Sequence, residues 1–203
     1  MNEQTMTVFI IDDDVAVLDS LTLMIEQAEL NVQAFHSARA FLDYYHPGML
    51  GCVVLDIKMP EIDGLHLQQK LIELNVPLPV IFLTGHGNIP MSVKAMKSGA
   101  SDFLTKPVKR DKLMTCIESA FEECKNWHIR QATRQHAQNL LSTLTDREME
   151  VMKLALDGQA NKQIAVELGI SHRTVEIHKS RVLQKTGVDN LLELARIVAD
   201  TAA

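Results

Sequence analysis

The sequence contains few cysteines, no apolar segment of membrane-spanning length, and no strong excess of positive charge. Its three cysteines are odd in number and lack the spacing of metal ligands, which favours reduced thiols in a cytosolic protein over a disulfide framework. The first residues have neither the basic nor the apolar region of a signal peptide. We therefore expect a soluble, cytoplasmic protein with no membrane partner.

The charge of the chain is divided unevenly. The formal net charge of −6 gives no reason by itself to expect a nucleic-acid partner. Residues 1–124 contain nine Lys and Arg against 17 Asp and Glu, whereas residues 125–203 contain 11 against nine. An acidic first part and a mildly basic second part indicate two domains with different tasks. The length of 203 residues is sufficient for two domains.

Short apolar runs alternate with amphipathic segments in the first part. Strands are expected at 8–11, 32–35, 51–56, 79–83 and 102–104, and helices at 15–28, 37–45, 64–74, 89–97 and from 110 onward. Five repeats of strand then helix predict a doubly wound parallel sheet. The apolar periodicity then fades without a Gly or Pro, which predicts a stiff helical linker at 125–139.

A second apolar pattern begins at residue 140. Thr145 and Glu148 have the spacing of a capping box ahead of the first helix of this part. Further helices are expected at 161–168, 171–186 and 190–200, the first two joined by a tight turn at Gly169. Residues 140–203 are therefore predicted to form an all-α, four-helix domain with a helix-turn-helix unit.

Polar residues stand where the expected strands end: Asp12 and Asp13, Asp56, Thr84 and Lys106. The carboxyl ends of parallel strands meet at one edge of a sheet, where ligands bind. Clustered carboxylates require a cation, and their hard oxygen ligands favour Mg²⁺. A lysine and a threonine can bind phosphoryl oxygens. This set suits phosphoryl transfer onto Asp56 as the nucleophile.

Each of these residues also has a simpler interpretation. Asp12 and its two acidic neighbours could serve only to cap the following helix. Asp56 could begin a turn, and Lys106 could be an ordinary loop residue. All of them occur at strand ends in the required order, and this favours the site.

The first part contains V-F-I-I-D-D, D-I-K-M-P followed by D-G, F-L-T-G, and D-F-L-T-K-P. With these segments in this order and spacing, residues 1–124 resemble the receiver domain of bacterial two-component response regulators. The resemblance implies that Asp56 accepts a phosphoryl group from a phosphohistidine on a sensor histidine kinase. By the same resemblance, Mg²⁺ is held by Asp12 (mainly through water), Asp13, Asp56 and the backbone carbonyl of Lys58. Thr84 and Lys106 hold the phosphoryl oxygens. Thr84 and Phe103 form a switch. The resemblance also implies a cis bond between Lys106 and Pro107.

The second part contains L-T-D-R-E-M-E-V-M, G-Q-A-N-K-Q-I-A-V-E-L-G-I-S, R-T-V-E-I-H and K-T-G-V. It resembles the LuxR/NarL-type helix-turn-helix domain, and the whole chain resembles the FixJ-type regulators. On the helix at 171–186, a polar face with two arginines and one apolar side chain could enter a major groove. The candidate DNA-binding residues are Lys162, Arg173, Thr174, Glu176, Ile177, Lys179, Ser180 and Arg181, with Lys185 as a further phosphate contact. Glu176 either accepts from a cytosine N4 amine or only flanks the site.

The two resemblances together predict a transcription regulator that is not a dedicated enzyme, although the receiver could dephosphorylate itself. Phosphorylation would shift the protein towards a homodimer that binds promoter DNA and acts with RNA polymerase. Three other functions remain open: an aspartyl-phosphate phosphohydrolase, a phosphorylation-independent DNA-binding regulator, and a ligand-gated LuxR-type factor. The first lacks a second acid close after Asp56, and the third would require an apolar ligand pocket.

Overall fold

The computed structural model describes residues 5–85 and 96–202, and the chain divides into two compact units, Met1–His128 and Ile129–Ala203. The strands of the first unit are β1 (Thr7–Ile11), β2 (Asn31–Phe35), β3 (Gly51–Asp56), β4 (Val80–Thr84) and β5 (Asp102–Thr105). Its helices are α1 (Val15–Glu26), α2 (Ala38–Tyr44), α3 (Gly64–Glu73) and the first part of α5 (Arg110–Ser142). The helix expected at 89–97 falls largely outside the described residues.

The strands form one parallel sheet in the order β2-β1-β3-β4-β5. From β1 the chain continues to β2 on one side of the sheet, and from β3 it continues to β4 and β5 on the other side. The carboxyl ends of β1 and β3 lie side by side where this direction changes. The register pairs Ile11 with Leu55 and Asp56 with Leu83, which aligns the ends of β1, β3 and β4. Polar residues that follow these strands are therefore brought to one edge of the sheet.

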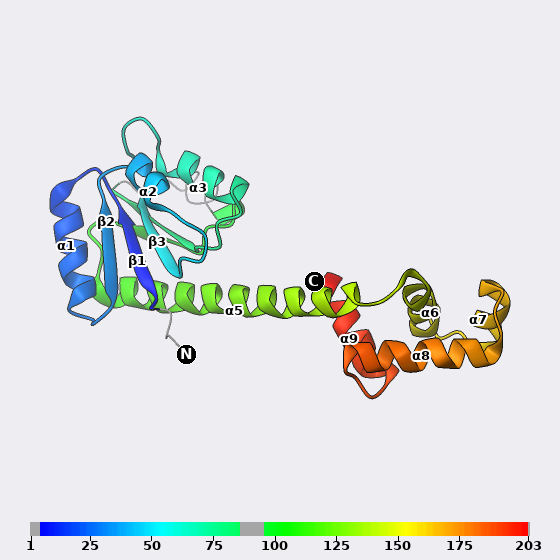
Figure 1. The fold of residues 1–203 in the computed structure, drawn as a ribbon. Helices are drawn as coiled ribbons and strands as arrows, with labels where there is room; N and C mark the ends of the chain where they lie inside the picture. The colour runs from blue at the N-terminus through cyan, green and yellow to red at the C-terminus, as the bar shows by residue number, and fades with distance from the viewer. Residues whose placement is uncertain (1–4, 86–95, 203) are drawn as a thin grey trace. The chain divides into compact units, whose positions relative to one another are not determined.

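Helices cover both faces of the sheet (Figure 1). On one face, Phe41 of α2 and Leu67 of α3 pack against strand residues such as Val53. On the other face, Leu18 of α1 and Ile117 of α5 pack in the second core of this unit. The strands are buried on both faces, which explains why they read as continuous apolar runs and not as alternating ones.

Helix α5 extends for 33 residues and includes the whole of the linker expected at 125–139. Its buried residues cluster in the first part, where Leu113, Ile117, Ala120 and Cys124 have almost no exposed surface. Beyond Lys125 most side chains are exposed, as the fading periodicity predicted. No described helix combines the length and the apolar character needed to cross a membrane.

The second unit is helical. It contains the end of α5 followed by α6 (Asp146–Leu156), α7 (Asn161–Leu168), α8 (His172–Thr186) and α9 (Leu191–Ala202). Thr145 and Glu148 form the expected capping box at α6, and Gly169 joins α7 to α8 with a positive φ of 65°. Two small cores are centred on Val151 with Val175 and on Met152 with Val182. The predicted fold class, a doubly wound five-stranded parallel sheet joined by a helix to a four-helix domain, is confirmed.

Candidate functional site

The polar residues predicted to form the site lie at the carboxyl ends of their strands. Asp12 follows β1, Asp56 ends β3, Thr84 ends β4 and Lys106 follows β5. Asp12, Asp56 and Thr84 are each at most 5% exposed, although their neighbours in the sheet are almost all apolar. Burial of two carboxylates at a sheet edge is unfavourable unless each is paired.

Lys106 provides that pairing. Its Nζ lies 2.5 Å from Asp12 Oδ2 and 2.6 Å from Asp56 Oδ1, so one ammonium group contacts both carboxylates. Backbone N–H groups satisfy the other oxygens: Lys58 donates to Asp56 Oδ2 over 2.6 Å, and Asp14 donates to Asp12 Oδ1 over 3.0 Å. The structure therefore brings Asp12, Asp56 and Lys106 together as predicted.

The chain after Asp56 turns tightly against the end of β3. The N–H of Ile57 donates to Leu83 O, and the N–H of Gly64 donates back to Ile57 O. A Cβ atom at Gly64 would lie 2.3 Å from Asp56 O, so only glycine allows this close approach. Asp63 then caps α3 by accepting from the N–H of His66. The turn fixes the backbone on both sides of Asp56.

Burial and pairing act on the site in opposite directions. Burial raises the pKa of Asp12 above its ordinary value, against the lowering effect of the hydrogen bond from Lys106. Burial lowers the pKa of Lys106, but the hydrogen bonds and charges of Asp12 and Asp56 outweigh it, so the net shift is upward. The lysine is therefore firmly protonated, as its short contacts with two carboxylates require.

The donor set of this edge fits a hard divalent cation. Asp12 Oδ2 and Asp56 Oδ1 converge on Lys106 Nζ, and Mg²⁺ commonly binds through one or two carboxylates and several waters, so these two acids can hold the ion beside the lysine. Asp13, the third predicted carboxylate ligand, is exposed next to them. Within residues 5–85 and 96–202, three or more His, Cys, Asp or Glu side chains do not come together as a metal-binding group. The residues of this edge that best suit Mg²⁺ are therefore the two buried acids, Asp12 and Asp56.

The predicted switch residues lie on neighbouring strands. Thr84 pairs in register with Thr105, and Phe82 with Phe103. Phe103 is half-buried and packs against the core that contains Phe82, while its backbone N–H donates to Asp102 Oδ1. The expected cis bond between Lys106 and Pro107 is present.

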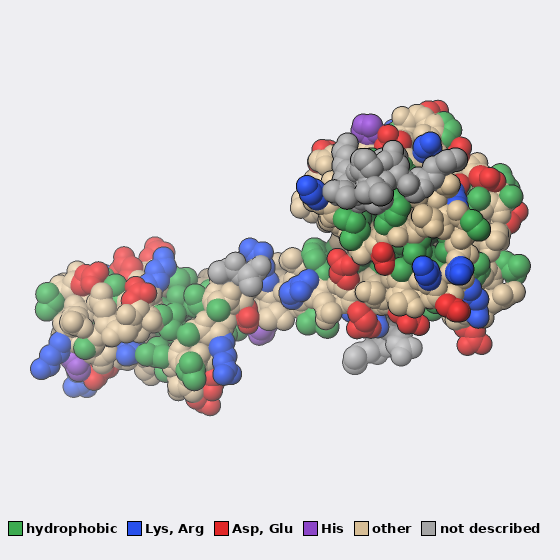
Figure 2. Space-filling model, turned by 180° about the vertical axis from the view of Figure 1, so that it is seen from behind, with side chains coloured by type: hydrophobic (Ala, Val, Ile, Leu, Met, Phe, Trp, Pro, Cys, Tyr) green, Lys and Arg blue, Asp and Glu red, His purple; other side chains and the backbone are tan. Residues whose placement is uncertain are grey.

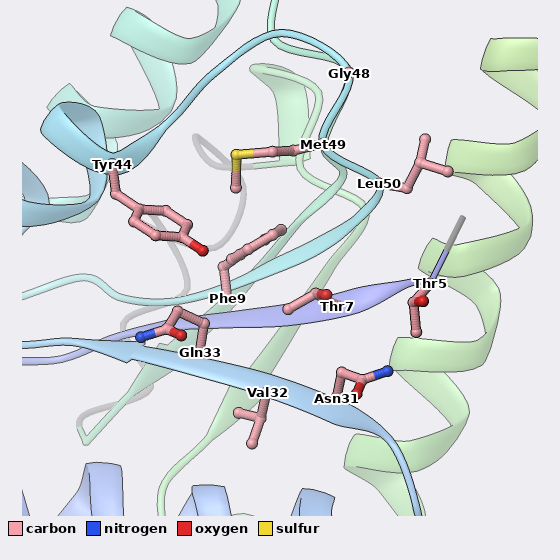
Figure 3. Close-up of a pocket in the computed structure, with 10 residues that line it drawn as sticks. All are labelled: Thr5, Thr7, Phe9, Asn31, Val32, Gln33, Tyr44, Gly48, Met49 and Leu50. Carbon is pink, nitrogen blue, oxygen red and sulfur yellow. The ribbon is translucent and has the colours of Figure 1, made fainter. Parts of the chain in front are cut away.

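A separate pocket lies near the amino ends of β1 and β2 (Figure 3). It has a volume of about 440 Å³ and ten lining residues, all uncharged. Phe9 lines it from β1, Tyr44 from the end of α2, and Met49 from the loop that leads to β3 (Figure 3). With no charged lining residue, this pocket does not offer the phosphoryl or metal chemistry predicted for the opposite edge.

The face of α8 predicted to bind DNA is exposed in the second unit. Val175, Val182 and Thr186 are buried, and the polar residues on the opposite side are exposed: Arg173, Glu176, Ser180 and Arg181. Ile177 is 44% exposed among them. On the face of the first unit drawn in Figure 2, acidic and basic side chains are interspersed. The exposed side of α8 thus offers the donors and the apolar contact expected of a groove-reading helix.

Other candidate DNA-binding residues have contacts within the unit. Lys162 of α7 is exposed, but Lys179 is half-buried and donates to Asn161 Oδ1 over 3.0 Å. Thr174 is half-buried, and its hydroxyl lies 2.8 Å from the Ser171 hydroxyl that caps α8. Thr174 therefore also contacts the cap of α8, and Lys179 contacts the start of α7.

An ion pair between α6 and α8 was not predicted. Lys185 Nζ lies 2.6 Å from Oε2 of Glu148, which is 3% exposed, and also donates to Thr143 O. The hydrogen bond from Lys185, helped by the backbone N–H of Thr145, lowers the pKa of Glu148 to about 2. The capping box identified Glu148, but its lysine partner is 37 residues away and carries no local signal. Lys185, suggested above as a phosphate contact, is engaged in this pair.

Comparison with known proteins agrees with this architecture. The family described as response regulator receiver domain matches residues 8–118, and the luxR family of bacterial regulatory proteins matches residues 142–198. The response regulator protein TmoT of Ectopseudomonas mendocina is 40% identical over 197 residues, covering 97% of this chain and 90% of that protein. The transcriptional regulatory protein FixJ of Bradyrhizobium diazoefficiens is 40% identical over 191 residues, covering 94% and 93%.

A low-resolution structure of the response regulator StyR superimposes with a TM-score of 0.84 at 38% identity, covering 96% of this chain and 98% of that one. Both halves of the chain, and not one alone, are thus matched along nearly their full length. The chain therefore belongs to the response regulators that combine a receiver domain with a LuxR-family DNA-binding domain, a group of transcription factors and not of dedicated enzymes.

Proposed function

We propose that Asp56 is the phosphoacceptor and that its phosphorylation controls DNA binding by α8. The observation that carries the proposal is the position of Lys106 Nζ, within 2.6 Å of both Asp12 and Asp56 at the carboxyl edge of the sheet. A buried carboxylate beside a fixed ammonium group and a buried threonine hydroxyl is placed to receive a phosphoryl group and to hold its oxygens.

The donor in this proposal is a phosphohistidine on a sensor histidine kinase. A carboxylate oxygen of Asp56 attacks phosphorus, the P–N bond of the phosphohistidine breaks, and the imidazole nitrogen leaves with the electron pair. Lys106 and the hydroxyl of Thr84 then bind phosphoryl oxygens of the acyl phosphate. Attack of water on phosphorus reverses the modification, so the receiver can dephosphorylate itself without being a dedicated enzyme.

Mg²⁺ supplies positive charge that offsets the phosphoryl oxygens and the acidic cluster when it is bound. Asp12, Asp13, Asp56 and the backbone carbonyl of Lys58 would hold it, with Asp12 acting mainly through water. Asp12 and Asp56 are held in place by Lys106 and by the backbone N–H groups of Asp14 and Lys58. The donor set is thereby ordered before the ion binds.

The proposed output is a population shift. Thr84 moves towards the phosphoryl oxygens and Phe103 turns inward, which re-forms the surface near β5 and favours a homodimer. The expected helix at 89–97 would contribute to that surface, but it lies largely outside the described residues. In this proposal residues 1–124 form the receiver, 125–139 the linker and 140–203 the DNA-binding domain.

The dimer would bind two half-sites of double-stranded promoter DNA in the cytoplasm and act with RNA polymerase. The exposed face of α8 supports its entry into a major groove, with bases contacted by residues such as Arg173 and Ile177. Lys162 and Lys179 would contact phosphates, which position the domain without reading sequence.

Gel filtration and DNA binding before and after treatment with a small phosphodonor and Mg²⁺ test this proposal. Wild type should shift to dimer and bind operator-containing duplexes more tightly, and Asp56→Asn should do neither. If Asp56→Asn dimerised and bound DNA as well as treated wild type, the proposed switch would be wrong. The chain would then be a phosphorylation-independent regulator.

A further inference from the structure

Glu176 is the one acidic residue of α8, which also contains two arginines and two lysines. It lies on the exposed side of the helix, between Arg173 one turn before it and Ser180 one turn after it. Its side chain is 56% exposed, so its position is not explained by packing in the unit. A carboxylate on a helix that approaches DNA is repelled by phosphates, and a contact with a base would offset this cost.

The local contact of Glu176 leaves its carboxylate available for a ligand. Oε1 lies 3.6 Å from Nδ1 of His172, which is longer than an ordinary hydrogen bond. His172 is the first residue of α8 and lies one turn before Glu176, so this contact runs along the helix surface. In the described part of the chain no hydrogen bond to this carboxylate is formed, so its oxygens stay hydrated and open to a ligand.

The major groove offers few donors. Only the N4 amino group of cytosine and the N6 amino group of adenine donate there, and adenine N7 places an acceptor beside its amino group. An ionised carboxylate accepts only, so cytosine is its better partner. We infer that Glu176 is a specificity-determining residue that accepts from the N4 amino group of a cytosine in the operator. This inference rests on the proposed entry of α8 into the major groove.

The test begins with selection of bound duplexes from a pool of random DNA by the full, phosphodonor-treated chain. Each cytosine of the best enriched duplex is then replaced, one at a time, by 2-pyrimidinone, which lacks only the N4 amino group. At one cytosine in each half-site we expect about tenfold weaker binding by wild type, the scale of one lost base contact. Glu176→Ala should lose that discrimination whatever its overall affinity, and its circular dichroism spectrum should match that of wild type.

Two variants sharpen the test. Glu167→Ala removes an exposed carboxylate from α7 of the same unit, and it should discriminate as wild type does. Glu176→Gln should shift the preference at the same position towards adenine, because an amide can both donate to N7 and accept from N6. If 2-pyrimidinone weakened binding by wild type and by Glu176→Ala equally at every cytosine, the inference about Glu176 would be overturned. The proposed DNA-binding function would still stand. If wild type enriched no sequence, the proposed DNA-binding function would fail as well.

Discussion

At the scale of single residues, Lys106 is the only positive charge in direct contact with the buried Asp12, so its replacement by methionine would leave that carboxylate unpaired within the described structure. We expect Lys106→Met to lower the free energy of unfolding by about 3 kcal/mol at neutral pH without Mg²⁺, as measured by urea denaturation. The double variant Lys106→Met/Asp12→Asn should recover part of the loss, because Asp56 keeps its hydrogen bond from the Lys58 backbone but not its ammonium partner. Equal instability of the single and double variants would contradict the pairing.

The same residues predict a pH dependence. Burial raises the pKa of Asp12, so the folded chain binds its proton more tightly than the unfolded chain does. The contribution of this group to stability is therefore present at low pH and is lost as pH rises through the folded pKa. The hydrogen bond from Lys106 lowers the pKa of Asp12, so removing Lys106 lets burial raise this pKa further. The loss of unfolding free energy in Lys106→Met should therefore be larger at pH 7 than at pH 5. Urea denaturation across this range measures it.

At the scale of elements, the start of α3 depends on Gly64. A methyl group there would lie 2.3 Å from Asp56 O and 3.0 Å from Ile57 Cα, so the end of β3 must move. We expect Gly64→Ala to cost about 1–3 kcal/mol and to slow phosphorylation by a small phosphodonor, because Asp56 is displaced. Gly85→Ala is the matched control for stability, since a Cβ atom at Gly85 meets no atom of residues 5–85 or 96–202 within 4 Å and its φ is not positive.

The second unit offers a prediction at the same scale, because Glu148 and Lys185 join the start of α6 to the end of α8. The pKa of Glu148 is lowered to about 2 from 4.5, so its stabilising effect is present above the unfolded pKa and is lost as pH falls towards 2. Lys185→Met should cost about 1–2 kcal/mol at pH 7 and flatten this acid dependence. Circular dichroism of thermal unfolding at pH 6 and pH 3 measures both. An unchanged acid dependence in Lys185→Met would exclude the pair as its cause.

The elements also show what could be read from the sequence. The strand ends and the helix caps were predictable because each depends on neighbours within a few residues: Asp56 after an apolar run, or Ser171 ahead of α8. The grouping of Asp12, Asp56 and Lys106 followed from parallel topology. The pairing of Lys185 with Glu148 could not be read in this way, since it depends on how two helices pack. The contact of Lys179 with Asn161 is a second case.

At the scale of the whole molecule, the two units have separate cores, and α5 contributes to both units. We expect their local stabilities to respond independently to substitutions in one unit. Hydrogen exchange followed by mass spectrometry should show that Lys106→Met loses protection in residues 5–85 and 96–124 and that Lys185→Met loses it in 140–202. Loss of protection throughout the chain in either variant would show that the units unfold together.

The proposed switch depends first on one covalent event at one residue. The most direct test is the intact mass of the protein after treatment with a small phosphodonor and Mg²⁺, with Asp56→Asn treated in parallel. We predict one added phosphoryl group in wild type and none in Asp56→Asn. An unmodified wild type, or an equal gain in both proteins, would contradict the assignment of Asp56 as the phosphoacceptor.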